Sequence, residues 1–120
     1  MKHALLALSL AASLAACATN PPVRMSGDTL VNEAGMTLYV FDKDTQQGKS
    51  ACNGPCAALW PAVAAPAGSR AAAPYSLVNR DDGAMQWAYK GKPLYTWTKD
   101  QKPGDRTGDG VNGIWHVAKE

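Results

Sequence analysis

Hydrophobic and polar residues alternate over short runs along most of the chain, a pattern typical of half-buried β-strands. In the run of residues 37–41, Leu38 and Val40 point to one face. Tyr39 and Phe41 point to the other. Clusters of Gly, Asn and Asp separate such runs and supply the turns. The pattern predicts a mainly β fold, a small antiparallel β domain.

Two β-hairpins are predicted, with turns at residues 32–35 and 90–92. The predicted strands cover, in chain order, residues 29–31, 37–41, 75–78, 85–89, 93–97 and 114–118. One short helix is predicted from Pro55 to Trp60, because proline suits the first helical position and Pro61 stops the helix.

The two hairpins are copies of one unit. Residues 35–44 (Gly-Met-Thr-Leu-Tyr-Val-Phe-Asp-Lys-Asp) match residues 91–100 (Gly-Lys-Pro-Leu-Tyr-Thr-Trp-Thr-Lys-Asp) at a constant offset of 56 positions. Such self-similarity is the mark of an internal repeat. The domain of residues 28–120 therefore divides into repeat one (28–63), an Ala/Pro-rich linker (64–74) and repeat two (75–118).

The N-terminus reads as a secretory signal helix over residues 1–16, with an apolar run too short to span a bilayer. Its end, Leu-Ala-Ala followed by Cys17, resembles the lipobox of bacterial lipoproteins. That resemblance implies cleavage before Cys17, lipidation of Cys17, and a tether over residues 17–27. Ala18, where Asp would favour inner-membrane retention, implies an anchor in the outer membrane facing the periplasm.

Charge and cysteine content narrow the function. The 12 basic and 10 acidic residues are scattered, with a net charge of +2 and no basic block, so nucleic acid is not an expected partner. In an oxidising compartment Cys52 and Cys56 are expected to form a disulfide. The alternative is a pair of thiols that binds copper, with His116 as the available histidine.

Two matching segments indicate a family. Tyr39-x-Phe41-x-x-Asp44 and Tyr95-x-Trp97-x-x-Asp100 resemble the bacterial secreted-repeat lipoproteins with a Tyr-x-(Phe/Trp/Tyr)-x-x-Asp motif. The Cys-containing segment 49–61 and the segment 112–117 also resemble that family. The resemblance covers about residues 28–118. It implies a two-repeat architecture and an envelope location, but no activity.

The repeated motif has two interpretations. As structure, the two aromatic rings form one packed strand face, and the aspartate accepts backbone N–H bonds where the strand ends. As function, stacked rings and a carboxylate at the strand end form a ligand site. We favour the structural interpretation, because both copies keep the same spacing.

Other candidate chemistry is sparse. The segment 105–113 begins like a calcium loop, yet its twelfth position is His116 rather than the expected Glu. We interpret it as a turn, with a weak Ca²⁺ site at Asp105 and Asp109 as the alternative. Asp81 and Asp82 also lie in a predicted turn, and no catalytic triad is apparent.

The sequence therefore predicts a lipid-anchored, non-enzymatic binding or interaction module of the cell envelope, without a cofactor. Its expected partner is an envelope protein or a small ligand. The expected contact surface is the rim near the repeated aspartates and the loop 105–113. The competing hypothesis is a copper-binding or redox accessory protein that uses Cys52 and Cys56.

Overall fold

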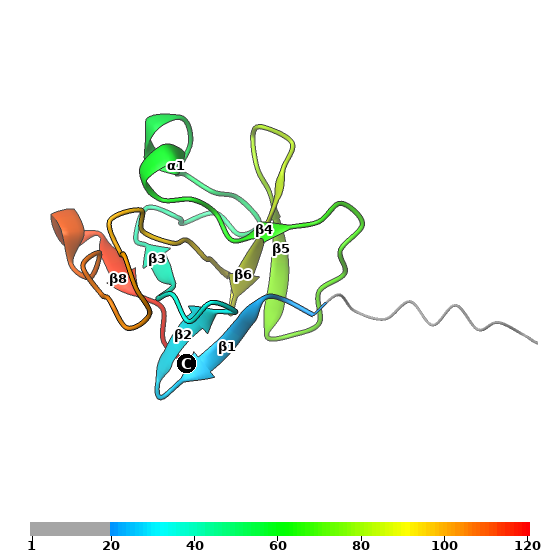
Figure 1. Cartoon of the computed structure of the whole chain (residues 1–120). Coiled ribbons are helices and arrows are strands. Elements are labelled where there is room, and N and C mark those ends of the chain that lie inside the picture. The colour runs from blue at the N-terminus through cyan, green and yellow to red at the C-terminus, as the bar shows by residue number, and fades with distance from the viewer. Residues whose placement is uncertain (1–19) are drawn as a thin grey trace, which may run out of the picture.

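The computed structural model describes residues 20–120 (Figure 1). The predicted signal peptide and Cys17 lie outside these residues. The elements are, in chain order, β1 (Val23–Ser26), β2 (Thr29–Asn32), β3 (Tyr39–Phe41), α1 (Pro55–Leu59), β4 (Ala64–Ala65), β5 (Tyr75–Asn79), β6 (Met85–Tyr89), β7 (Lys92–Pro93), the 3₁₀ turn η1 (Val111–Gly113) and β8 (Trp115–Val117). None of the helices in the described part is long and apolar enough to cross a membrane.

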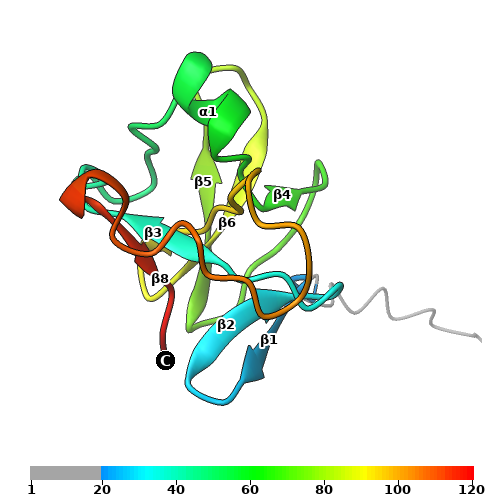
Figure 2. The ribbon, with the colours of Figure 1, turned by 60° about the vertical axis from the view of Figure 1, so that its left-hand side comes forward.

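The strands form three small antiparallel sheets, which confirms the predicted fold class. β1 pairs with β2 and β3 pairs with β8, while the third sheet has the order β4-β6-β5, with β7 also paired to β6. The β1–β2 hairpin and α1 lie at opposite ends of the domain (Figures 1 and 2).

Two hydrophobic clusters fill the interior, and the alternation in each repeat divides residues between them. Leu38 and Leu94 lie in the first core, which packs around Trp87. Tyr39 and Tyr95 lie in the second core, which is mostly aromatic. The predicted alternation of faces along residues 37–41 is therefore confirmed, and both of its faces are covered.

The two repeats meet at equivalent residues. Tyr39 N donates to Tyr95 O over 2.8 Å, and Tyr95 N donates to Tyr39 O over 3.0 Å. A reciprocal pair of this kind between residues 56 positions apart relates the two units by a local pseudo-twofold axis. The same pairing explains why the first predicted hairpin is short. Residues 36–38 still form hydrogen bonds with β2. From Tyr39 onward the chain pairs with two segments of repeat two, at Tyr95 and at β8.

The second predicted hairpin is present, with a tighter turn than expected, but its second strand, β7, ends at Pro93 rather than at Trp97, and Tyr95 forms only isolated bridges. Tyr89 pairs with Lys92, so the loop is the dipeptide Lys90-Gly91. Both loop residues have positive φ, 48° and 78°, which is the backbone of the type I′ hairpin turn. The predicted helix is also correct apart from its last residue, because Trp60 caps α1 rather than belonging to it.

Two segments assigned to loops contain strands. β1 lies inside the predicted tether, where Val23 packs against the first core and Gly27 turns the chain back into β2. β4 lies inside the predicted linker, where Ala64 pairs with Gln86. In both cases pairing with a neighbouring strand stabilises the strand, whereas its own composition does not predict a strand.

Candidate functional site

The motif residues of one repeat bond to those of the other. Tyr39 Oη donates a hydrogen bond to Asp100 Oδ2 over 2.6 Å, and Tyr95 Oη donates to Asp44 Oδ2 over 2.6 Å. We call this pair of bonds the cross-repeat clasp. Burial raises the pKa of both tyrosines well above the ordinary value, and the neighbouring carboxylates raise it further.

The second oxygen of each aspartate closes its own loop. Asp44 Oδ1 accepts from Ala51 N over 2.7 Å, and Asp100 Oδ1 accepts from Thr107 N over 2.9 Å. Ala51 and Thr107 are again 56 positions apart. The aspartates therefore accept backbone N–H bonds, as the structural interpretation expects, although from residues seven positions away rather than from a local turn.

The motif aromatics belong to a continuous stack in the second core. Phe41 stacks on Trp115 with ring centroids 4.1 Å apart, Trp115 on Trp60 at 3.8 Å, and Trp60 on Trp97 at 3.9 Å. Tyr39 meets this stack edge-on at Trp60, as its counterpart in repeat two does at Trp115. The three stacked contacts thus cover six ring faces with protein side chains, and the geometry supports a structural role for the motif.

Cys52 and Cys56 form the predicted disulfide, with Cα atoms 5.2 Å apart. His116 lies on the opposite face of β8 from Trp115, where its Nε2 is 2.7 Å from Asp42 Oδ2. The structure therefore does not bring together the three residues of the alternative copper site. No cluster of three potential metal ligands occurs among the residues the structure describes.

The carboxylates of the predicted turn 105–113 serve the backbone. Asp105 Oδ2 accepts from Gln101 N and Lys102 N over 2.9 and 3.2 Å, and these bonds lower the pKa of Asp105. Asp109 Oδ1 accepts from Val117 N over 3.1 Å. The two side chains thus hold different segments, which is the arrangement of a structural turn.

A buried arginine, Arg80, was not among the residues predicted to belong to a site. Arg80 is only 7% exposed, and its Nη1 donates to Ser50 Oγ over 3.0 Å and to Gln86 Oε1 over 2.7 Å. Ser50 Oγ lies 2.8 Å from Tyr95 Oη, so the guanidinium connects to the cross-repeat clasp and, through it, to Asp44. Burial raises the pKa of Asp44, although the surrounding hydrogen bonds and Arg80 act in the opposite direction. The sequence gives no signal for this network, because Arg80 stands in an ordinary turn pattern.

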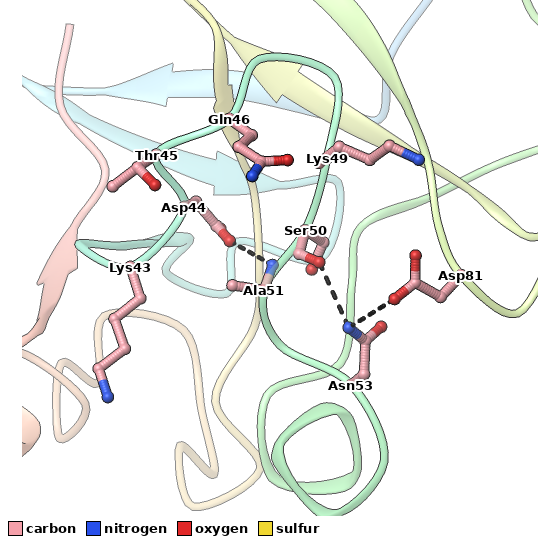
Figure 3. Close-up of a pocket in the computed structure, with 9 residues that line it drawn as sticks. All are labelled: Lys43, Asp44, Thr45, Gln46, Lys49, Ser50, Ala51, Asn53 and Asp81. Atoms are coloured by element: carbon pink, nitrogen blue, oxygen red, sulfur yellow. Dashed lines mark hydrogen bonds between the residues drawn. The ribbon is translucent and has the colours of Figure 1, made fainter.

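A polar pocket of about 370 Å³ opens over this network, on the loop of repeat one (Figure 3). We call it the loop-one pocket. Its lining residues are Lys43, Asp44, Thr45, Gln46, Lys49, Ser50, Ala51, Asn53 and Asp81. Asn53 Nδ2 braces one wall by donating to Ser50 O and Asp81 Oδ2, each over 3.3 Å. Lys43 and Lys49 extend toward opposite sides (Figure 3), so they do not converge on one anion.

The equivalent loop of repeat two is fastened to the first hairpin instead. Arg106 Nη2 donates to Thr29 Oγ1 over 2.6 Å, and Thr37 Oγ1 donates to Asp105 O over 2.7 Å. Pro103 also packs close to Gly35. The predicted contact surface therefore divides: the rim of repeat one carries the loop-one pocket, while the loop of repeat two is used for packing.

Fold and site together define a β protein built from two copies of one unit that clasp each other through Tyr and Asp. A family model described as a secreted repeat of unknown function matches residues 23–64 and 76–119. The chain belongs to this family. The matched segments coincide with the two structural repeats and include β1. The description of the family as secreted agrees with an extracellular or envelope location. No curated protein and no solved structure matches the chain significantly.

Proposed function

We propose that this protein is a non-enzymatic binding module of the cell envelope, and that the loop-one pocket is its contact surface. The observation that carries the proposal is that some side chains of this pocket are hydrogen-bonded to buried residues while others are exposed. Asp44 and Ser50 accept hydrogen bonds from Tyr95 and Arg80, whereas Thr45, Gln46 and Lys49 line the same pocket and are exposed. A binding site usually combines side chains that are held in place by hydrogen bonds with exposed polar side chains that can contact a ligand.

The chemistry of the rim selects a polar partner. Gln46 and Thr45 offer neutral donors and acceptors, while Lys43 and Lys49 offer separated positive charges. A polar loop of an envelope protein, or a small polar ligand, matches such a surface better than an apolar molecule does. Because the hydrogen bonds of Asp44 and Ser50 already exist without the partner, binding requires little ordering of the protein.

We further propose that Cys17 anchors the protein by lipid to the outer membrane, facing the periplasm. β1 begins at Val23, so five residues (18–22) separate Cys17 from the domain, and this stretch spans at most roughly 20 Å. Substitution Cys17→Ser should release the protein into the soluble periplasmic fraction. Recovery of that variant with the outer membrane would argue against the anchor.

A site-specific photo-crosslinker tests the pocket in intact cells. Placed at Gln46, it should capture one envelope partner or ligand. Its matched control is the same crosslinker at Lys102, the exposed residue 56 positions later in repeat two. Capture at both positions, or at neither, would show that the loop-one pocket is not the contact surface.

A further inference from the structure

The outer edge of β5 is an unpaired strand edge. β5 lies at one side of the sheet β4-β6-β5, and among the described residues β6 is the one strand that pairs with it (Figure 2). One side of β5 is therefore committed to the sheet. On the other side, residues 20–120 place no strand.

The bonds of β6 show which backbone groups of β5 point outward. Trp87 N donates to Val63 O, and Trp87 O accepts from Leu94 N, so both groups of Trp87 point away from β5. In an antiparallel ladder, residues opposite such a residue turn their groups outward as well. Leu77 is opposite Trp87. Its N–H and C=O therefore face the outer edge, where the described residues provide no backbone partner.

The composition of β5 leaves this edge unprotected. Natural edge strands are commonly protected by charge or proline. β1 carries Arg24, β7 carries Lys92 and Pro93, and β8 carries His116. β5 reads Tyr-Ser-Leu-Val-Asn, with neither a charge nor a proline. β4, at the other edge of the same sheet, also lacks both but has only two residues, so β5 is the longer unprotected edge and the better suited to strand addition.

We propose that β5 pairs antiparallel with β5 of a second copy of this chain. Because Leu77 presents a donor and an acceptor on the same side, two copies centred on Leu77 form two reciprocal hydrogen bonds about a twofold axis. Tyr75 then lies opposite Asn79 of the second copy, and no like charges meet. The pairing continues the sheet across both copies.

The contact is small, so the dimer is weak. Two five-residue edges bury far less than the roughly 1,200 Å² of a stable interface. Attachment of both copies to one membrane would raise their effective concentration. In solution the association should depend on protein concentration.

Sedimentation velocity of the mature chain carrying Cys17→Ser tests the pairing, from about 10 μM to about 1 mM, the range of weak complexes. The average mass should rise toward that of two copies. Leu77→Pro removes an N–H that β6 does not use and should keep the chain monomeric at every concentration. Leu77→Ala, the matched control, loses the side chain but keeps the N–H and should still associate. A monomeric parent chain, or association of Leu77→Pro equal to that of Leu77→Ala, would overturn the proposal.

A second variant covers the case in which Leu77→Pro does not fold, as judged by circular dichroism. Asn79→Lys places a charge on the exposed end of the edge and should weaken association at least several-fold. Ala58→Lys adds the same charge at an exposed position of α1 and should leave association unchanged. Equal association of the two variants would also overturn the proposal.

Discussion

Tyr39 and Asp100 stand in different repeats, yet the hydroxyl of Tyr39 lies 2.6 Å from Asp100 Oδ2. Tyr95 and Asp44 form the same bond in the opposite direction. The repeated motif is therefore completed between units: each repeat supplies the tyrosine for one bond and the aspartate for the other. One repeat alone would leave a buried tyrosine hydroxyl and a carboxylate without these partners.

Tyr39→Phe should lower the free energy of unfolding by about 1.5–3 kcal/mol, the range for a hydrogen bond to a charged group. The variant removes the donor to Asp100 and also the acceptor for Gly108 N, which lies 3.2 Å from the hydroxyl. Urea unfolding measures the change. Tyr75→Phe is the control, because no hydrogen bond of that hydroxyl occurs among the described residues, and it should change stability by less than about 0.5 kcal/mol.

A double-mutant cycle makes this prediction specific. Tyr39→Phe and Asp100→Asn should be coupled, with the double variant less destabilised than the sum of the single ones. Additive effects would show that the two side chains do not interact in solution.

Alkaline pH should weaken the fold through the same tyrosines. The unfolded chain releases their protons near the ordinary pKa of 10.0, whereas burial and the carboxylate partners raise the pKa of Tyr39 and Tyr95 in the folded chain. Above pH 10 the folded state therefore binds more protons than the unfolded state, and stability falls as pH rises. Below pH 10 the contribution is fully present.

Urea unfolding from about pH 8 to about pH 11 measures this slope. A chain carrying both Tyr39→Phe and Tyr95→Phe should lose less stability over that range than the parent chain. Identical slopes would show that these two hydroxyls do not govern the alkaline transition.

Local features of the sequence were predictable because their causes are local. The alternation along residues 37–41, the turn at Lys90-Gly91, and the prolines around α1 each act within a few residues. The disulfide followed from compartment and spacing. β1 was not predictable, because its stability comes from pairing with β2 after a proline pair that favours an extended chain.

The clasp and the arginine network depend on distant partners. Tyr39 and Asp100 are 61 positions apart, and Arg80 and Ser50 are 30 apart. The repeat shows that both motifs are equivalent, but it does not show whether each tyrosine meets its own aspartate or that of the other unit. Only the antiparallel pairing of Tyr39 with Tyr95 decides this.

Gly108→Ala should destabilise the aromatic stack. A Cβ at Gly108 would lie 2.9 Å from ring atoms of Trp60 and Tyr39, both held in the second core. Such overpacking typically costs about 1–3 kcal/mol, and it should reduce the near-ultraviolet circular dichroism of the stacked tryptophans. Gly48→Ala separates this effect from backbone strain, since Gly48 has a positive φ but no atom near its Cβ position. It should lower stability by about 1 kcal/mol without changing the aromatic spectrum. An unchanged spectrum in Gly108→Ala would contradict the packing described.

Loss of the disulfide should weaken the fold without removing it. Closing a five-residue loop contributes about 2 kcal/mol in the chain-entropy model, and loss of the Cys52 side chain, which is fully buried in the second core, adds to the destabilisation. None of the strand pairings in the described residues uses either cysteine. The variant carrying both Cys52→Ala and Cys56→Ala should therefore unfold at a lower urea concentration yet keep partner capture at Gln46.

Native mass spectrometry of the Cys17→Ser chain, purified without reductant, should give a mass lower than the dithiol form by two hydrogen atoms, with no adduct. Copper bound to free thiols, or loss of capture in the doubly substituted chain that still folds, would move the function to Cys52 and Cys56.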